Sequence, residues 1–118
     1  MAFTTEFVIG AGGGVEEIPV SMSGAGNGVT YPLTTVNAGD GAVILVVGTM
    51  VPASTTSSSR PHLQIGTYTH SDPSTYLTGP TGIGVGGLFT GSVQIAVLSR
   101  TTITTPTTFT GTVYVARL

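Results

Sequence analysis

The amino-acid sequence predicts an all-β protein, an antiparallel β-sandwich of about eight short strands, of which the jelly roll is one form. No segment carries apolar residues at helical spacing over three turns, and strong helix formers are scarce. Short runs rich in Val, Ile and Thr are instead separated by Gly, Pro and Asn, which is typical of strands joined by turns. A phrase that occurs twice near the end of the chain supports the same class.

This phrase reads FTGSVQIAVL at residues 89–98 and FTGTVYVARL at residues 109–118. In each copy a Thr-Gly pair is predicted to form a turn that starts an apolar strand. The linker between the copies leaves two arrangements open. A loop would make the copies antiparallel neighbours, whereas a return strand through Ile103 would make them parallel in direction. Gln94 and Val97 of the first copy become Tyr114 and Arg117 in the second, so we expect the last strand to be an edge or contact strand.

The other strands are predicted from alternating polarity and from the turn residues that flank them. Pro19 cannot donate a hydrogen bond to a ladder and predicts a sheet edge, where Glu16 and Glu17 would discourage further pairing. Asn27-Gly28 predicts a tight turn. The run AVILVVGTMV predicts a central strand covered on both faces. The predicted strands are 2–9, 15–22, 29–33, 42–51, 62–69 and 83–88.

The N-terminal segment is predicted to be separate from the body of the domain. Phe3, Phe7 and Ile9 share one parity of an extended segment, and the sequence GAGGG follows at residues 10–14. Because this break is so rich in glycine, it would let the segment leave the domain and pair with another sheet. We therefore divide the chain into an arm with its hinge, residues 1–14, and a sandwich, residues 15–118. The three apolar side chains of the arm are candidate partner contacts.

The composition excludes several classes of partner. Only 7% of the 118 residues are charged, against about 25% in an ordinary domain, and three scattered arginines with no lysine cannot form the basic patch that nucleic acid requires. The longest apolar run is half of the roughly 20 residues that span a membrane. The N-terminus lacks a secretory signal pattern. A surface with so few charged residues has two explanations. Either neighbouring proteins cover it, or Thr hydroxyls provide its solvation.

No catalytic residue, metal site or cofactor is predicted. The chain has no Cys, and no GxSxG element that would expose a nucleophilic serine. His62, His70 and Asp72 do not have the spacing of a zinc site. The segments GAGNG and GIGVGG are not followed by helical sequence, as a nucleotide-binding loop would be, and their glycines are predicted to serve turns and packing.

Tyrosines are the only candidates for stacking on a sugar, because the chain has no Trp. Tyr76 lies in the predicted loop 71–82. Tyr114 lies on the parity opposite the apolar Val113 and Val115, which leaves it on the surface or in a second core. We take Tyr76, Tyr114 and Arg117 as candidate contacts with a partner.

The chain resembles small virion proteins of tailed bacteriophages, in particular the head-decoration and minor tail proteins of phages that infect actinobacteria. The resemblance is carried by MAFTTEFVIG at the start, AGDGAVILVV in the middle and GTVYVARL at the end, within a lysine-free chain rich in Thr, Gly and Val. It implies a non-enzymatic structural protein at the virion surface, bound to the major capsid protein or to a tail protein. It also implies a homo-oligomer, with a trimer favoured for decoration, and an N-terminal extension that grips the shell. A tail or fibre module that binds host glycans is the alternative.

Overall fold

The computed structural model of the chain describes residues 14–52, 60–67, 69–71, 77–100 and 105–118. All regular secondary structure in these residues is β-strand, as the sequence predicts. The N-terminal arm lies outside the described residues, apart from Gly14. The strands are β1 (Val15–Gly24), β2 (Asn27–Asn37), β3 (Ala42–Val51), β4 (His62–Ile65), β5 (Thr69–His70), β6 (Thr81–Phe89), β7 (Ser92–Arg100) and β8 (Thr107–Arg117).

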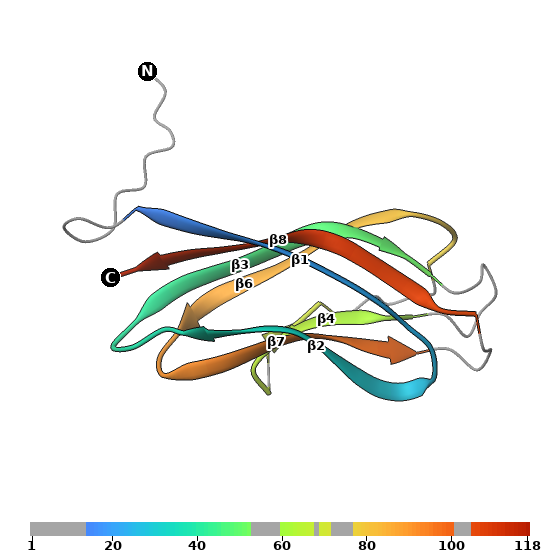
Figure 1. Cartoon of the computed structure of the whole chain (residues 1–118), viewed down its shortest axis with the longest axis horizontal. Coiled ribbons are helices and arrows are strands. Elements are labelled where there is room, and N and C mark those ends of the chain that lie inside the picture. Colours follow the sequence, from blue (N-terminus) through green and yellow to red (C-terminus); the bar gives the residue numbers. More distant parts are fainter. Residues whose placement is uncertain (1–13, 53–59, 68, 72–76, 101–104) are drawn as a thin grey trace, which may run out of the picture.

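The strands form two four-stranded sheets that pack face to face (Figure 1). Sheet A has the order β1-β8-β3-β6, and sheet B has the order β2-β7-β4-β5. Every pair of neighbouring strands is antiparallel. Consecutive strands cross from one sheet to the other, except at β4 and β5. This order is that of two interlocked Greek keys, so the predicted sandwich is a jelly roll.

The core lies between the sheets and is filled by the inward-facing parity of each strand. In β3 the buried residues are Ala42, Ile44, Val46 and Met50, which follow the period of two that a strand imposes. The other large, fully buried apolar side chains come from β4, β7 and β8. They are Leu63, Ile65, Ile95, Val97, Phe109, Val113 and Val115.

Several predicted boundaries agree with the structure. Residues 15–22 and 42–51 fall in strands, and β1, which contains Pro19, is an edge of sheet A. The predicted strand 62–69 is instead divided into β4 and β5 by a turn at Gly66, whose φ is 66°.

The predicted turn at Asn27-Gly28 is wrong. Both residues belong to β2, and the register with β7 shifts between Asn27 and Val29. Gly28 has a φ of 84°, a value that glycine tolerates in a bulge. The chain reverses one pair earlier, at Ala25 and Gly26. The Asn-Gly signal therefore marks a bulge at the start of a strand instead of a hairpin.

The prediction that β3 is covered on both faces is also wrong. This strand is central in sheet A, between β8 and β6, but only its inward face is buried. On the outward face Leu45 and Val51 are 41% and 38% exposed. A continuous apolar run does not distinguish a strand buried on both sides from one that presents an apolar face to the outside.

The two copies of the repeated phrase do not form equivalent structures. The strand of the first copy, β7, lies in sheet B, whereas β8 lies in sheet A between β1 and β3. The copies are therefore not neighbours, and the prediction of an edge position for the last strand is wrong. Gly91 forms the predicted turn with a φ of 72°, but Gly111 lies inside β8.

Candidate functional site

The outer face of sheet A is the principal apolar surface among the described residues. It is formed by the outward parity of β3 and β6, since Val43 pairs with Leu88 and Val47 pairs with Gly84. Leu88 is 65% exposed. Three successive outward positions of β6 are glycine, and side chains of β3 extend over two of them, Val47 over Gly84 and Leu45 over Gly86. The outward residues of the two strands are Val43, Leu45, Val47, Thr49, Val51, Gly82, Gly84, Gly86 and Leu88.

Tyr114 lies on this same outer face and is half-buried. It pairs with Glu17 of β1 on one side and with Leu45 of β3 on the other. Leu45 pairs in turn with Gly86 of β6. Across the sheet, one row of paired residues thus consists of the carboxylate of Glu17, the phenol ring of Tyr114, the aliphatic side chain of Leu45 and the backbone of Gly86. Of the two surroundings that the sequence allows for Tyr114, the structure shows the surface position.

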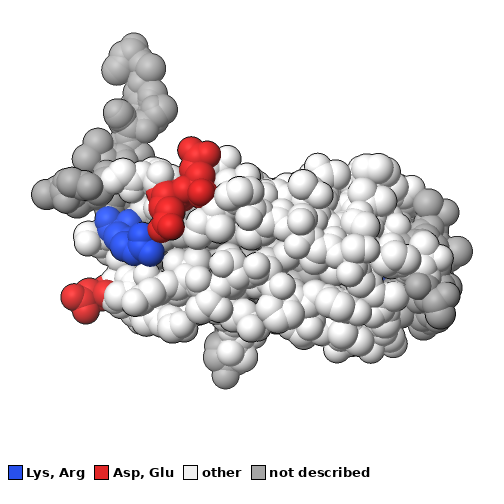
Figure 2. Space-filling view, viewed as in Figure 1, with Lys and Arg blue, Asp and Glu red and all other residues white. Residues whose placement is uncertain are grey.

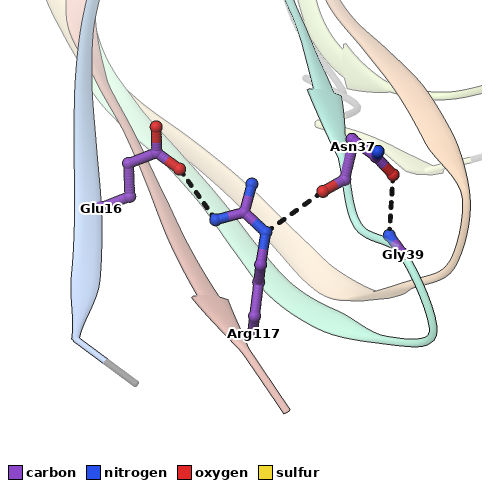
Figure 3. Close-up of polar contacts among 4 residues, drawn as sticks. All are labelled: Glu16, Asn37, Gly39 and Arg117. Atoms are coloured by element: carbon purple, nitrogen blue, oxygen red, sulfur yellow. Dashed lines mark hydrogen bonds and ion pairs between the residues drawn. The ribbon is translucent and has the colours of Figure 1, made fainter. Parts of the chain in front are cut away.

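Arg117 makes intramolecular contacts at the end of the sandwich (Figure 3). Its Nη1 donates to Oε1 of Glu16 at 2.9 Å, and its Nε donates to the backbone carbonyl of Asn37 at 3.2 Å. The Asn37 side chain accepts a hydrogen bond from the Gly39 amide at 2.9 Å. Arg117 thereby joins β8 and β1 to the turn between β2 and β3. Because both charged side chains are about half-exposed, the ion pair contributes less than about 1 kcal/mol.

The charged side chains on the face shown in Figure 2 gather at one end of the sandwich. The same view in Figure 1 places the C-terminus at this end. The other described residues visible on that face are uncharged. A surface of this kind offers no electrostatic attraction for a strongly charged partner, and shape and apolar contact are left to provide recognition.

The two histidines pack against each other. His62 in β4 and His70 in β5 are stacked, with ring centroids 5.7 Å apart. No group of three or more His, Cys, Asp or Glu side chains converges within the part of the chain that the structure describes. Asp72 lies outside the described residues.

A shallow cavity of about 400 Å³ lies beside the β4–β5 turn and the β6–β7 turn. It is lined by residues such as Gly66, Thr67, Phe89 and Gln94, and no charged side chain contributes to it. Its lining residues carry the hydroxyls of Thr67, Thr69 and Ser92 but no acidic or basic side chain that would activate them.

The structure thus bears on two of the six predicted contact residues. Tyr114 is on the outer face of sheet A, and Arg117 bonds to Glu16 and Asn37 of the same chain. Phe3, Phe7, Ile9 and Tyr76 lie outside the described residues. Sequence reasoning missed the apolar outer face itself. Glycine at alternate positions of β6, beside a long apolar run, was the signal that could have indicated it.

Comparison with protein-family models, with curated proteins and with solved structures finds no match. In the described part of the chain, no helix has the length and apolar character needed to cross a membrane.

Proposed function

We propose that the protein is a non-enzymatic structural component of a bacteriophage virion, which decorates the capsid surface and stabilises it by binding the major capsid protein. The observation that supports this proposal best is the apolar outer face of β3 and β6 in sheet A, two strands without a charged residue. Monomeric soluble proteins seldom expose continuous apolar surface of this kind unless a partner covers it. The resemblance of the sequence to small virion proteins supplies the class of partner.

Physical considerations agree with this role. A protein that reinforces a shell needs contact area and shape complementarity, and it needs no reactive group. Surfaces of Thr, Gly and Val lose little on desolvation when they pack against a neighbour. Many copies bind one virion, so a modest affinity for each contact accumulates. The N-terminal arm, residues 1–14, would add a second contact by pairing with a neighbouring sheet.

Binding to capsids that lack the protein tests this proposal with two variants. Leu45→Lys places a charge in the centre of the outer face and is expected to weaken binding about ten-fold or more, as for a central contact residue. Deletion of residues 1–14 is expected to leave a folded domain that no longer binds. Thr35→Lys, at an exposed position of β2, is the matched control and should bind like the wild type. Co-sedimentation measures all four proteins, and saturation of the capsids by both variants would refute the proposal.

A tail or fibre module that binds host glycans is the second candidate. It is favoured by Tyr114, whose ring lies on the open sheet face beside Glu17, since a flat ring with a neighbouring carboxylate can stack on a sugar and accept its hydroxyl hydrogen bonds. For this candidate we expect binding on a glycan array that Tyr114→Ala abolishes and Arg117→Ala leaves intact. Tyr76→Ala would test the other predicted tyrosine. Absence of glycan binding by the wild type would remove this candidate.

A further inference from the structure

The four edges of the two sheets differ in how well they are protected against pairing with another strand. In sheet A, β1 carries Pro19 together with Glu16 and Glu17. In sheet B, β2 carries Pro32 and two irregularities of register, and β5 is only two residues long. Proline, charge, bulges and short length are the usual devices that prevent edge pairing. Three of the four edges therefore have such protection.

The fourth edge, β6, has none of these devices. It is nine residues long, Thr81–Phe89, and it contains neither proline nor a charged residue. Its register with β3 is regular throughout. In the described part of the chain, the backbone hydrogen bonds outside the sheets involve no residue of β6. A long, regular and uncharged edge invites another strand to pair with it.

The sequence of β6, TGIGVGGLF, is complementary to itself. If two copies pair antiparallel over all nine residues, the register is fixed with Val85 opposite Val85 of the partner subunit. On the outer face Leu88 then lies opposite Gly82, and Gly84 lies opposite Gly86. On the inner face Ile83 lies opposite Gly87. Leu88 and Ile83 thus meet glycines, and Val85 meets only a second valine, so the side chains can pack without collision.

We propose that β6 is a homodimerisation edge, which pairs antiparallel with β6 of a second copy around a two-fold axis at Val85. The two four-stranded A sheets then join into one continuous sheet. Main-chain hydrogen bonds between the two β6 strands supply affinity, and the alternation of large and small side chains fixes the register. The contact is isologous, so it closes as a dimer.

β6 is less buried than the adjacent β3, as expected if a strand of a second copy normally pairs with its free edge. Its inward-facing Ile83 and Val85 are only partly buried, whereas Ile44 and Val46 on the inward face of the adjacent β3 are fully buried. On the outer face Leu88 is 65% exposed. No heavy atom lies within 4 Å of the position that a Cβ of Gly82 would take. The space above Gly82 can accommodate Leu88 of the partner subunit.

This inference does not depend on the proposed function. It differs from the trimer that the resemblance implies, because a two-fold contact alone cannot make a trimer. The N-terminal arm (residues 1–14) of another copy is the alternative strand that would pair with the same edge. The experiments below distinguish the two occupants, and none of them uses capsids.

The mass of the full chain in solution is the first test. We expect sedimentation equilibrium to give twice the 11.8 kDa of one chain. Gly82→Lys and Leu88→Lys each place a charge at the contact and should raise the dissociation constant about ten-fold or more. Both positions are exposed, so the thermal unfolding of the monomer should be preserved. Ser21→Lys, exposed on the opposite edge of sheet A, is the matched control and should remain dimeric.

Cross-linking between single-cysteine variants tests the register, because the chain has no cysteine of its own. A mixture of Gly82→Cys and Leu88→Cys should form a disulfide-linked heterodimer under mild oxidation, since these positions are opposite each other across the two-fold contact. Leu88→Cys alone should not, because its two copies would be six residues apart along the strand, about 20 Å.

Four results would overturn the proposal. The first is a monomer at every concentration at which the chain is soluble. The second is a dimer that both lysine variants leave intact. The third is Leu88→Cys alone cross-linking as fast as the mixture. Fourth, if deletion of residues 1–14 removes the dimer and the mixture does not cross-link, the arm is the occupant and β6 does not pair with itself.

Discussion

Gly111→Ala is expected to destabilise the protein by about 3 kcal/mol or more, a severe effect for a single methyl group. Gly111 of β8 faces Gly48 of β3 across the ladder. A Cβ at Gly111 would overlap the carbonyl oxygen of Val47 and would lie 2.9 Å from Cα of Gly48. These are backbone atoms of the central strand pair, so the collision can be relieved only by moving the strands apart.

The comparison variant for this prediction is Gly82→Ala. Gly82 is also a strand glycine, but its Cβ would meet no heavy atom within 4 Å. We expect a change within about 0.5 kcal/mol. Urea denaturation of both variants, with midpoint and slope compared to wild type, measures the difference. Equal tolerance of the two alanines would show that β3 and β8 do not approach each other as closely as the structure has them.

Phe109→Ala is expected to cost about 3 to 5 kcal/mol, as large-to-small changes at fully buried aromatic residues do. The Phe109 side chain is fully buried. Its Cζ lies 2.6 Å and 2.7 Å from the positions that a Cβ of Gly48 and of Gly111 would take. The ring thus fills the space that the two glycines leave empty, and its removal opens a cavity directly above the backbone. Such a loss is a large share of the roughly 5 to 15 kcal/mol that stabilises a domain.

Phe89→Ala provides the matched control, because Phe89 is the same residue in the first copy of the repeated phrase. It is only partly buried, at the end of β6, and lines the open cavity. We expect a loss of about 1 to 2 kcal/mol. Chemical denaturation again measures both variants. Equal losses would mean that the two phenylalanines are equally buried, which contradicts the structure.

The candidate contact residues show how far sequence reasoning extends. Alternation placed Tyr114 opposite the core valines, and the structure confirms that it is outside. Arg117 was predicted as a partner contact because it replaces Val97 of the first copy. The structure shows it bonded to Glu16 and Asn37, which are distant in sequence. No local pattern contains that information, since the three residues meet only after both sheets are assembled.

The sequence by itself determined the all-β class, most strand positions and the parity that faces the core, because side-chain alternation and turn residues act locally. The tertiary structure alone decided that β8 is a central strand, which apolar face stays open and what each Thr-Gly pair does. Gly91 forms a turn, and Gly111 allows two strands to approach under Phe109. The two copies share the same local sequence and differ in their neighbours, so packing between distant strands selects between the conformations that glycine permits.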